Sequence, residues 1–165
     1  MFDVEKIRQD FPILTREVYG KPLIYLDNAA SAQKPKAVLD AMMKSMTQEY
    51  ANVHRGLHFL SNAATQSFED ARESVRRFIN APSKDQIIFT RNATDAINLV
   101  AQSFGGMVIG AGDEIILSIL EHHSNIVPWH FHRERREAVI KWAPIDDEGN
   151  FYSMNLKNSS AHAPR

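Results

Sequence analysis

A chain of 165 residues holds one domain or part of a larger one. Its 44% hydrophobic and 24% charged residues are the balance of a soluble globular protein. The formal net charge of −1 argues against nucleic acid or an anionic membrane as a partner, and the absence of cysteine excludes disulfides, thiolate metal sites and a cysteine nucleophile within these residues.

The N-terminal residues are not expected to form a targeting signal. Residues 1–12 have charges scattered through them and no apolar run, unlike a signal peptide. No apolar stretch in the sequence approaches the ~20 residues that a membrane-spanning helix needs. We therefore expect a cytoplasmic protein.

The first part of the chain predicts an arm, a strand and a helix. Residues 1–20 read as a short amphipathic arm in which Pro12 interrupts any helix. The apolar run 23–26 has strand character and ends in a small polar segment, as a strand-to-loop exit would. Pro35 stands where a helix can begin, and apolar residues follow it at helical spacing.

The next segment, residues 51–60, contains a glycine and two histidines and indicates a loop. Ser61 or Asn62 is expected to cap the helix that follows. That helix has apolar residues with a clear period of 3.6, and the Asn-Ala-Pro-Ser segment at 80–83 ends it.

Strands and helices alternate in the rest of the chain. Strands are expected at 87–90, 114–118 and 138–142, and helices from the turn at 91–95 to Phe104 and over 126–137. This alternation predicts the α/β class with a mostly parallel sheet. The tail at 152–165 has no apolar periodicity and is expected to be disordered.

The turn after the expected strand at 87–90 is a candidate anion site. A helix N-terminus offers free N–H groups and the positive end of the helix dipole, which together hold phosphate well. Asn92, Ala93 and Thr94 stand at that end, and the Thr94 hydroxyl can donate to a phosphate oxygen. The alternative is an ordinary cap, in which Thr94 bonds only to its own helix.

Two histidines, His122 and His123, follow the expected strand at 114–118. Open α/β sheets place ligands at the carboxyl ends of their strands, where an imidazole can stack on a flat cofactor or move protons. We expect the two rings to point to opposite faces, so that at most one lies in a site. The alternative is a hydrogen-bonded structural histidine. A metal centre is not expected, because the His-Glu-x-x-His form is absent.

The loop at 51–60 supplies a third candidate, the polar group of His54, Arg55 and His58. A guanidinium can bind a substrate carboxylate through two parallel hydrogen bonds, so Arg55 is the candidate ligand-binding residue of this loop. The alternative is an ion pair on the surface or at an interface.

Three stretches together resemble one family: YLDNAASAQKP at 25–35, ANVHRGLHFLSNAAT at 51–65 and EHHSNIVPW at 121–129. They resemble the SUF-type cysteine desulfurases, class V aminotransferase enzymes of fold type I among pyridoxal-phosphate proteins. HRGLH and EHHSNIVPW are specific for this branch, whereas the Asp-x-Ala-Ala piece is shared more widely. The resemblance runs over about residues 2–151 and implies a partial cofactor-binding domain over 21–151.

The resemblance implies roles for residues of the cofactor site, with pyridoxal 5'-phosphate as the cofactor. His122 matches the histidine that stacks on the pyridine ring, and it is also a candidate proton shuttle. Asn92, Ala93 and Thr94 match the turn that holds the cofactor phosphate. Ala93 replaces a common threonine there, which removes one side-chain donor but leaves the backbone N–H groups.

The resemblance also implies residues on the substrate side. His54 and Arg55 match a pair near the substrate and the dimer partner, and Ala29 and Ala30 match the loop that lines the substrate side. The implied reaction removes sulfur from L-cysteine, giving alanine and an enzyme persulfide for iron–sulfur cluster assembly. The implied partners are a second copy of the chain and a sulfur-acceptor protein.

Part of the family's machinery has no match in these residues. The Schiff-base lysine, the aspartate that pairs with the pyridine nitrogen, the persulfide cysteine and the arginine that grips the substrate carboxylate come later in the family's sequences. We therefore expect a truncated desulfurase that is inactive alone. Two alternatives stay open: a non-catalytic fragment that binds a full-length desulfurase, and another class V enzyme such as a selenocysteine lyase.

Overall fold

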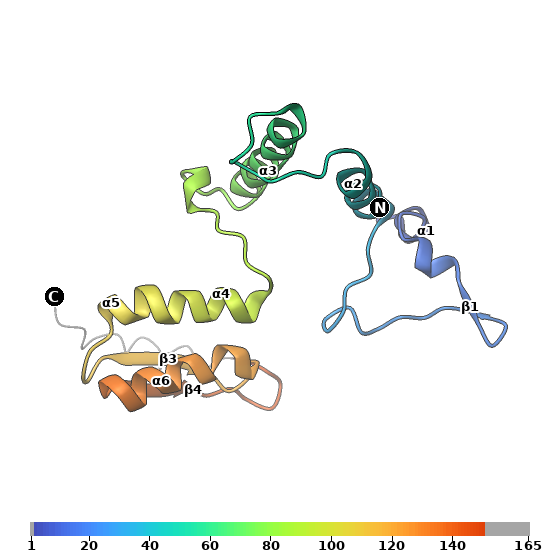
Figure 1. Ribbon diagram of the computed structural model, residues 1–165. Helices are drawn as coiled ribbons and strands as arrows, with labels where there is room; N and C mark the ends of the chain where they lie inside the picture. The colour runs from blue at the N-terminus through green and yellow to red at the C-terminus, as the bar shows by residue number, and fades with distance from the viewer. Residues whose placement is uncertain (1, 151–165) are drawn as a thin grey trace. The chain divides into compact units, whose positions relative to one another are not determined.

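The computed structural model describes residues 2–150, so the tail expected at 152–165 lies outside the described residues. The chain divides into two compact units between Ile87 and Ile88. Figure 1 shows the elements of both units along the chain.

The first unit opens with short elements. They are α1 (Val4–Arg8), the 3-10 helix η1 (Pro12–Thr15), and the antiparallel strands β1 (Glu17–Val18) and β2 (Lys21–Pro22). Tyr19 and Gly20 form the two-residue turn between the strands, and both have positive φ. Such a turn matches the twist of a hairpin, which explains a strand pair that the amphipathic pattern of the arm did not predict.

Two long helices follow in this unit. α2 (Lys36–Gln48) begins directly after Pro35, its N-cap, as expected. α3 (Phe59–Phe78) begins earlier than expected, because the Nδ1 atom of His58 accepts a hydrogen bond from the backbone N–H of Ser61 and caps the helix. The expected cap at Ser61 or Asn62 was therefore wrong, and both residues lie inside α3.

The end of α3 agrees with the sequence pattern. The helix stops at Phe78, and Asn80 turns the chain away with a left-handed φ of 55°. A single 3-10 turn, η2 (Lys84–Gln86), then leads to the end of the unit.

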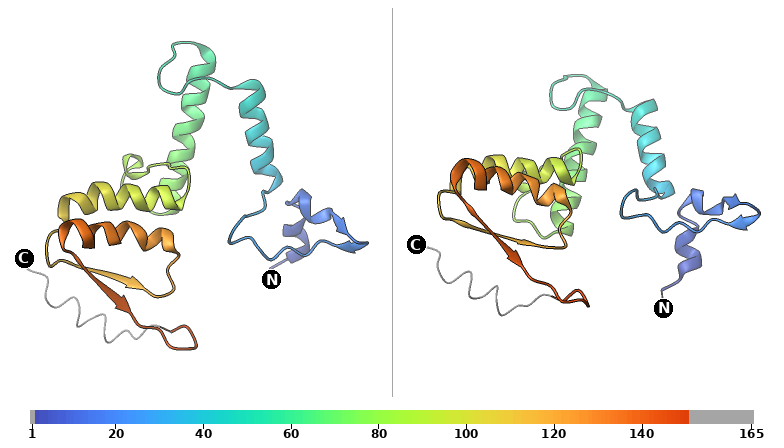
Figure 2. Two further views of the ribbon diagram at one scale, coloured as in Figure 1. Left: turned by 60° about the horizontal axis from the view of Figure 1, so that its bottom comes forward. Right: turned by 90° about the horizontal axis from the view of Figure 1, so that it is seen from below.

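The second unit contains a β-α-β element. The strands β3 (Glu114–Ser118) and β4 (Val139–Ala143) pair in parallel, and α6 (Val127–Arg136) connects them through the 3-10 turn η4 (His123–Asn125). The expected parallel pairing and the α/β class are confirmed, and the second strand is shifted by one residue. Figure 2 shows α6 running beside the helix that precedes β3.

That preceding helix consists of three joined segments: α4 (Ala93–Val100), the π-helical turn η3 (Ala101–Gly105) and α5 (Gly106–Val108). The π turn begins at Ala101, whose carbonyl oxygen accepts a hydrogen bond from the Nε2 atom of His132 at 2.7 Å. A side chain that inserts into the helical hydrogen-bond ladder is a recognised cause of such a bulge.

Two expected strands do not form. Residues 23–26 and 87–90 carry no strand in the structure. A strand exists only where ladder hydrogen bonds pair it with a neighbour. Leu23 donates to the carbonyl of Arg16 at 3.0 Å, next to the β1–β2 hairpin, but among residues 2–150 neither 23–26 nor 87–90 pairs as a strand in a sheet. Apolar composition alone therefore overpredicted strand at both places.

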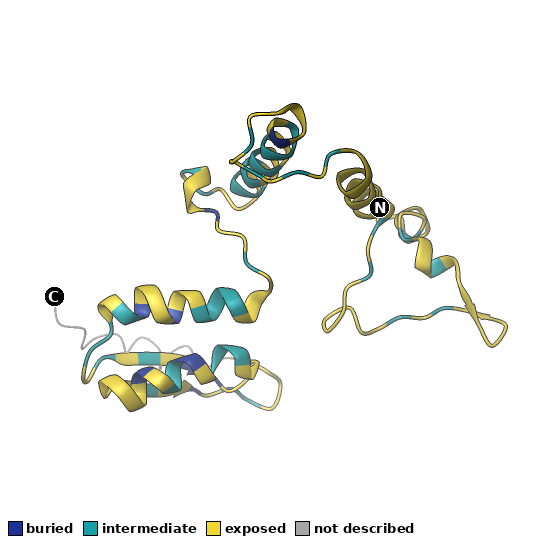
Figure 3. Ribbon diagram, viewed as in Figure 1, coloured by how far each residue is buried: buried dark blue, intermediate teal, exposed yellow. Residues whose placement is uncertain are grey.

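The hydrophobic core of the described residues is small. Its buried members are Ile87, Ala101, Leu117, Ala138 and Ala143. Figure 3 shows how much of both units is exposed, and the exposed residues include large apolar side chains such as Leu26, Phe78 and Met107. Exposed apolar surface of this extent favours association with another surface.

Candidate functional site

The turn before α4 leaves backbone donors free for an anion. The Oδ1 atom of Asn92 accepts from the N–H of Asp95 at 2.9 Å, so the Asn92 side chain is the helix cap. The N–H groups of Ala93 and Thr94 and the Thr94 hydroxyl donate to no other group in the described part of the chain. Thr94 is exposed, so these donors can reach a ligand.

The charges beside this turn are balanced. The guanidinium of Arg91 contacts both carboxylate oxygens of Asp95, with N–O distances of 3.2 Å. These side-chain hydrogen bonds, followed by one from the Arg91 backbone N–H, lower the pKa of Asp95. Because Arg91 is paired with Asp95, a phosphate at this turn would depend mainly on backbone N–H groups and the helix dipole.

His122 is held in a defined orientation at the start of η4. Its Nδ1 atom accepts a hydrogen bond from the backbone N–H of Ser124 at 3.2 Å and lies 2.9 Å from the Ser124 hydroxyl. An acceptor at Nδ1 leaves Nε2 as the protonated nitrogen of the neutral ring. The side chain is exposed, so Nε2 can meet a ligand.

The expectation that His122 and His123 point to opposite faces was wrong. Their rings stack with centroids 4.2 Å apart and an interplanar angle of 21°. The pair stands at the start of a 3-10 turn rather than in a strand, so the alternation of strand side chains does not apply. One face of the His122 ring is covered by His123, and its other face is left for a flat ligand.

A chain of hydrogen bonds fixes the segment that carries the two histidines. Glu121 accepts from the Ser118 hydroxyl at 3.0 Å and from the Asn125 amide at 2.9 Å. Asn125 in turn accepts from the indole N–H of Trp129 at 3.0 Å. The sequence pattern indicated the two histidines but not the side chains that hold their segment in place. The spacing of four residues between Glu121, Asn125 and Trp129 is the signal that could have indicated them.

The phosphate-turn candidate and His122 belong to neighbouring elements. α4 lies beside η4 within the second unit, so the helix that begins at Ala93 packs against the segment that begins at His123. The other predicted site residues, Ala29, Ala30, His54 and Arg55, belong to the first unit.

Ala29 and Ala30 lie in an exposed turn. The turn is closed by the N–H of Ser31, which donates to the carbonyl of Asp27 at 3.0 Å. The hydroxyl of Tyr25 also donates to the carbonyl of Ser31 at 2.7 Å. Because Ala29 and Ala30 carry only methyl side chains, they leave their backbone exposed to an approaching ligand.

His54 and Arg55 differ in their surroundings. The Nε2 atom of His54 lies 3.0 Å from a carboxylate oxygen of Glu69, and the ring meets Phe68 edge-on with centroids 5.6 Å apart. Arg55 is exposed, and its guanidinium has no hydrogen bond or ion pair within residues 2–150. Arg55 is therefore the residue of this pair that is free to bind an anion.

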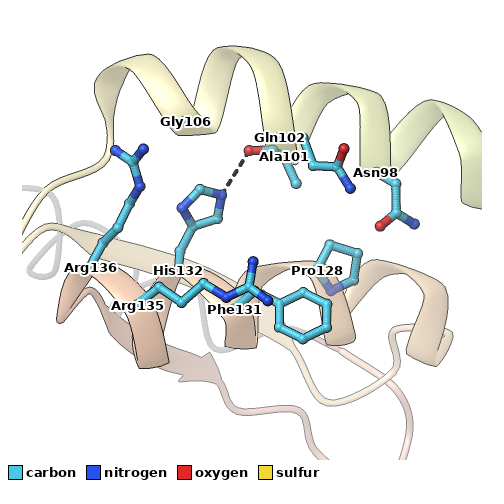
Figure 4. A pocket seen from close by; sticks show the side chains of 9 residues that line it. All are labelled: Asn98, Ala101, Gln102, Gly106, Pro128, Phe131, His132, Arg135 and Arg136. Carbon is cyan, nitrogen blue, oxygen red and sulfur yellow. Dashed lines mark hydrogen bonds between the residues drawn. The ribbon is translucent and has the colours of Figure 1, made fainter.

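A separate groove lies between the α4–η3–α5 helix and α6, with a volume of about 360 Å³. Figure 4 shows its lining: Asn98, Ala101, Gln102, Gly106, Pro128, Phe131, His132, Arg135 and Arg136. His132 is only 7% exposed and bridges the two helices through Ala101, so its role here is packing.

No group of three or more potential metal ligands occurs in the part of the chain that the structure describes. Among the same residues, none of the helices has the length and apolar character needed to cross a membrane.

The sequence of this chain is similar to one protein family and to several of its members. The family model for class V aminotransferases matches residues 24–163. The chain is 52% identical over 151 residues to a probable cysteine desulfurase of Synechocystis, covering 92% of this chain and 36% of the relative. It is 51% identical over 155 residues to a cysteine desulfurase of Enterobacter, covering 94% and 38%. The chain thus spans little more than a third of these relatives.

Solved structures agree with the sequence comparisons. The apo cysteine desulfurase of Thermococcus onnurineus matches with a TM-score of 0.85 at 37% identity, over 96% of this chain and 38% of that one. The cysteine desulfurase CsdA of Escherichia coli matches with a TM-score of 0.70 at 35% identity, over 89% and 36%.

Proposed function

Because this chain belongs to the class V aminotransferase family, we propose that it forms part of a pyridoxal-phosphate-dependent cysteine desulfurase. The observation that carries the proposal is the pairing of free N–H groups at the start of α4 with the exposed ring of His122 in the neighbouring segment. About half of the residues are identical to those of two proteins named cysteine desulfurase, which supports the same activity.

The residues present fit the proposed cofactor. Pyridoxal phosphate joins a phosphate to a flat aromatic ring. The N–H groups of Ala93 and Thr94 and the Thr94 hydroxyl suit the phosphate, and the open face of His122 suits the ring. The backbone N–H groups compensate for the side-chain donor that Ala93 lacks. When bound, this cofactor supplies an electron sink for carbanion chemistry.

His122 has two functions in this proposal. Its ring would stack on the cofactor, and its Nε2 atom would hold or move a proton, because Nδ1 is engaged by Ser124. The hydrogen-bond chain through Glu121 and Asn125 keeps the ring in place.

The substrate side is proposed on the exposed residues of the first unit. His54 and Arg55 match a pair near the substrate, and the exposed guanidinium of Arg55 can bind an anionic group there. The family's arginine that grips the substrate carboxylate comes later than these residues. The turn of Ala29 and Ala30 lines the same side. The SUF-type branch is supported by the motifs HRGLH and EHHSNIVPW. For a member of that branch we propose a homodimer in the cytoplasm that delivers sulfur to an acceptor protein.

The chain holds no cysteine to accept sulfur, and the family's Schiff-base lysine has no match in it. We therefore propose that the chain alone, given pyridoxal phosphate, does not turn over L-cysteine. Sulfide and alanine release no faster than the free cofactor's background is the expected result.

A chimera tests the function itself. Residues 1–151 are joined to the remaining C-terminal part of the Synechocystis relative, and release of alanine and sulfide from L-cysteine is measured. Activity that His122→Ala lowers strongly supports the proposal. Activity with L-selenocysteine alone favours the selenocysteine lyase alternative, and a folded chimera inactive toward both substrates overturns the proposal.

A further inference from the structure

The groove between the α4–η3–α5 helix and α6 is separate from the residues proposed to hold the cofactor. Ala93, Thr94 and His122 are not part of its lining. Its volume of about 360 Å³ is within the usual range for pockets that bind small molecules. One wall contains the π turn η3, and π turns within α-helices are rare and occur frequently at functional sites. Two further features of the lining point to a ligand.

The first feature is a ring nitrogen of His132 that the packing of the two helices does not use. The Nε2 atom lies 2.7 Å from the carbonyl oxygen of Ala101. A carbonyl only accepts, so Nε2 carries the proton, and Nδ1 of the neutral ring is an acceptor. Nδ1 is buried and has no hydrogen-bond partner within residues 2–150. Because an unpaired buried acceptor is costly, a ligand that donates to Nδ1 gains over one that cannot.

The second feature is the charge of the lining. Arg135 and Arg136 line the groove together with His132, whereas no carboxylate does (Figure 4). The Arg135 guanidinium lies 4.9 Å from the centre of the Phe131 ring, and Arg136 donates to the carbonyl of Ile109 at 3.2 Å. Neither arginine forms an ion pair with a carboxylate that the structure describes. Guanidiniums without a carboxylate partner are suited to bind one from a ligand.

The helix dipoles do not cancel this charge. The α4–η3–α5 helix and α6 end at the same end of the groove, because Arg136 in the last turn of α6 donates to Ile109, the residue after α5. Each helix C-terminus carries about half of one negative charge. The two helix ends therefore offset about one of the two guanidinium charges, and this end of the groove stays positive.

We propose that the groove binds a small hydroxy acid anion. The carboxylate accepts hydrogen bonds from the guanidiniums of Arg135 and Arg136, and the hydroxyl donates to Nδ1 of His132. Lining atoms shield Nδ1 from solvent, and Arg135 and Arg136 are exposed side chains with long stems that can move aside. A guanidinium that turns onto the carboxylate opens the way for the hydroxyl. Such a site is additional to the proposed desulfurase function and does not depend on it.

A pair of probes isolates the hydroxyl of the ligand. L-Malate and succinate are both dicarboxylates, and they differ only in the hydroxyl of malate. Each is titrated into the ¹⁵N-labelled chain at mildly alkaline pH, and the ring nitrogens of His132 are followed by NMR. L-Malate should shift the Nδ1 signal until the site is saturated. Succinate should bind roughly 3- to 10-fold more weakly, which is the effect of one lost hydrogen bond.

Variants on the same helix test the guanidiniums. Arg135→Gln should weaken L-malate binding roughly tenfold, since it removes a charged donor. Arg133→Gln is the matched control, because it removes the same charge from α6 outside the groove, and it should change binding little. Thr94→Ala should leave L-malate binding unchanged, which separates this groove from the candidate phosphate turn. Circular dichroism checks that each variant keeps its helix content.

The outcomes separate the parts of the proposal. Equal affinity for L-malate and succinate would overturn the hydrogen bond to Nδ1, and with it the hydroxy acid as the ligand class. The groove is not a binding site if neither acid shifts the signals of His132. Equal weakening by Arg133→Gln and Arg135→Gln would also overturn the site, because it would mean that the acids are attracted only by the basic helix as a whole.

Discussion

The Nδ1 atom of His122 accepts a hydrogen bond from the backbone N–H of Ser124, two residues further along the chain. A neutral imidazole with an acceptor at Nδ1 carries its proton on Nε2. ¹⁵N NMR at mildly alkaline pH should therefore show the Nε2–H tautomer for His122. Ser124→Ala should keep this tautomer, because it removes the hydroxyl and leaves the backbone N–H. A dominant Nδ1–H signal in the unmodified chain would contradict the assignment.

Cofactor binding tests the turn at the start of α4. Thr94→Ala removes a donor to a charged phosphate, which costs roughly 1.5–3 kcal/mol, or about tenfold to hundredfold in the dissociation constant of pyridoxal phosphate. Fluorescence or calorimetry measures the change. Thr47→Ala is the matched control, since Thr47 lies in α2 of the first unit. Equal affinity of Thr94→Ala and the unmodified chain would mean that Thr94 does not hold the phosphate. Ser124→Ala does not serve as a control for cofactor binding, because the Ser124 hydroxyl lies 2.9 Å from the Nδ1 atom of His122, the residue proposed to stack on the cofactor.

The sequence correctly predicted those helices and strands that depend on residues close together in the chain. The strand at 114–118 and the helices α2 and α6 follow from apolar spacing and, for the helices, from a proline at or beside the first turn, all of which lie within a few residues. The strands expected at 23–26 and 87–90 failed because a strand depends on a partner strand, and neither segment belongs to a sheet of the described residues.

The same distinction applies to the site. The sequence motifs indicated the donors at Ala93 and Thr94, which belong to one turn. They did not indicate that His54 pairs with Glu69, or that Glu69 also pairs with Lys84, because each pair is separated by 15 residues. They also misplaced the rings of His122 and His123, since strand alternation was assumed where a 3-10 turn forms.

An ion-pair cluster near the end of α3 gives a pH-dependent prediction. Hydrogen bonds from Arg76, and then from Arg77, lower the pKa of Glu73 from 4.5 to about 2. Because the folded pKa is the lower one, the ionised form stabilises the fold at pH above 4.5, and this contribution is lost as pH falls toward about 2. NMR titration of the Glu73 carboxyl measures the pKa directly, and Arg76→Gln should raise it.

The stability consequence is tested with Glu73→Gln. The loss of its helix content is followed by circular dichroism as urea is added. At neutral pH the variant should unfold at a lower urea concentration than the unmodified chain, and this difference should shrink as pH falls from 4.5 to about 2. The effect should be modest and weaker at high salt, because the Glu73 side chain is 32% exposed. A difference that grows on acidification would refute the assignment. Glu134→Gln, an exposed residue of α6, is the control.

The two-stranded sheet predicts self-association. β3 and β4 each have one edge without a strand partner among residues 2–150, and Ile116 and Trp142 on these strands are 39% and 44% exposed. Open edges and apolar surface promote pairing between chains. Sedimentation velocity should show association that increases with concentration and that Ile116→Lys reduces more than Val4→Lys in α1. A monodisperse monomer with a cooperative thermal transition would be inconsistent with this.

Gly105 in the π turn lies close to the His132 ring of α6. A Cβ atom there would lie 2.9 Å from the Nε2 atom of His132. The ring cannot retreat without losing its hydrogen bond to Ala101, and it is almost fully buried. Gly105→Ala should therefore destabilise the unit by about 1–3 kcal/mol, the usual cost of overpacking, although alanine is intrinsically the better helix former.

Gly106→Ala is the matched control one residue away. The nearest atom to a Cβ there is 3.9 Å distant, so this change should be neutral or stabilising by up to ~1 kcal/mol. Unfolding in urea, followed by circular dichroism, measures both variants. The cause is isolated by a double-mutant cycle: with His132→Ala in the background, the clash disappears and Gly105→Ala should cost much less. If Gly105→Ala is as stable as Gly106→Ala in the unmodified background, His132 does not pack against this turn as the structure places it.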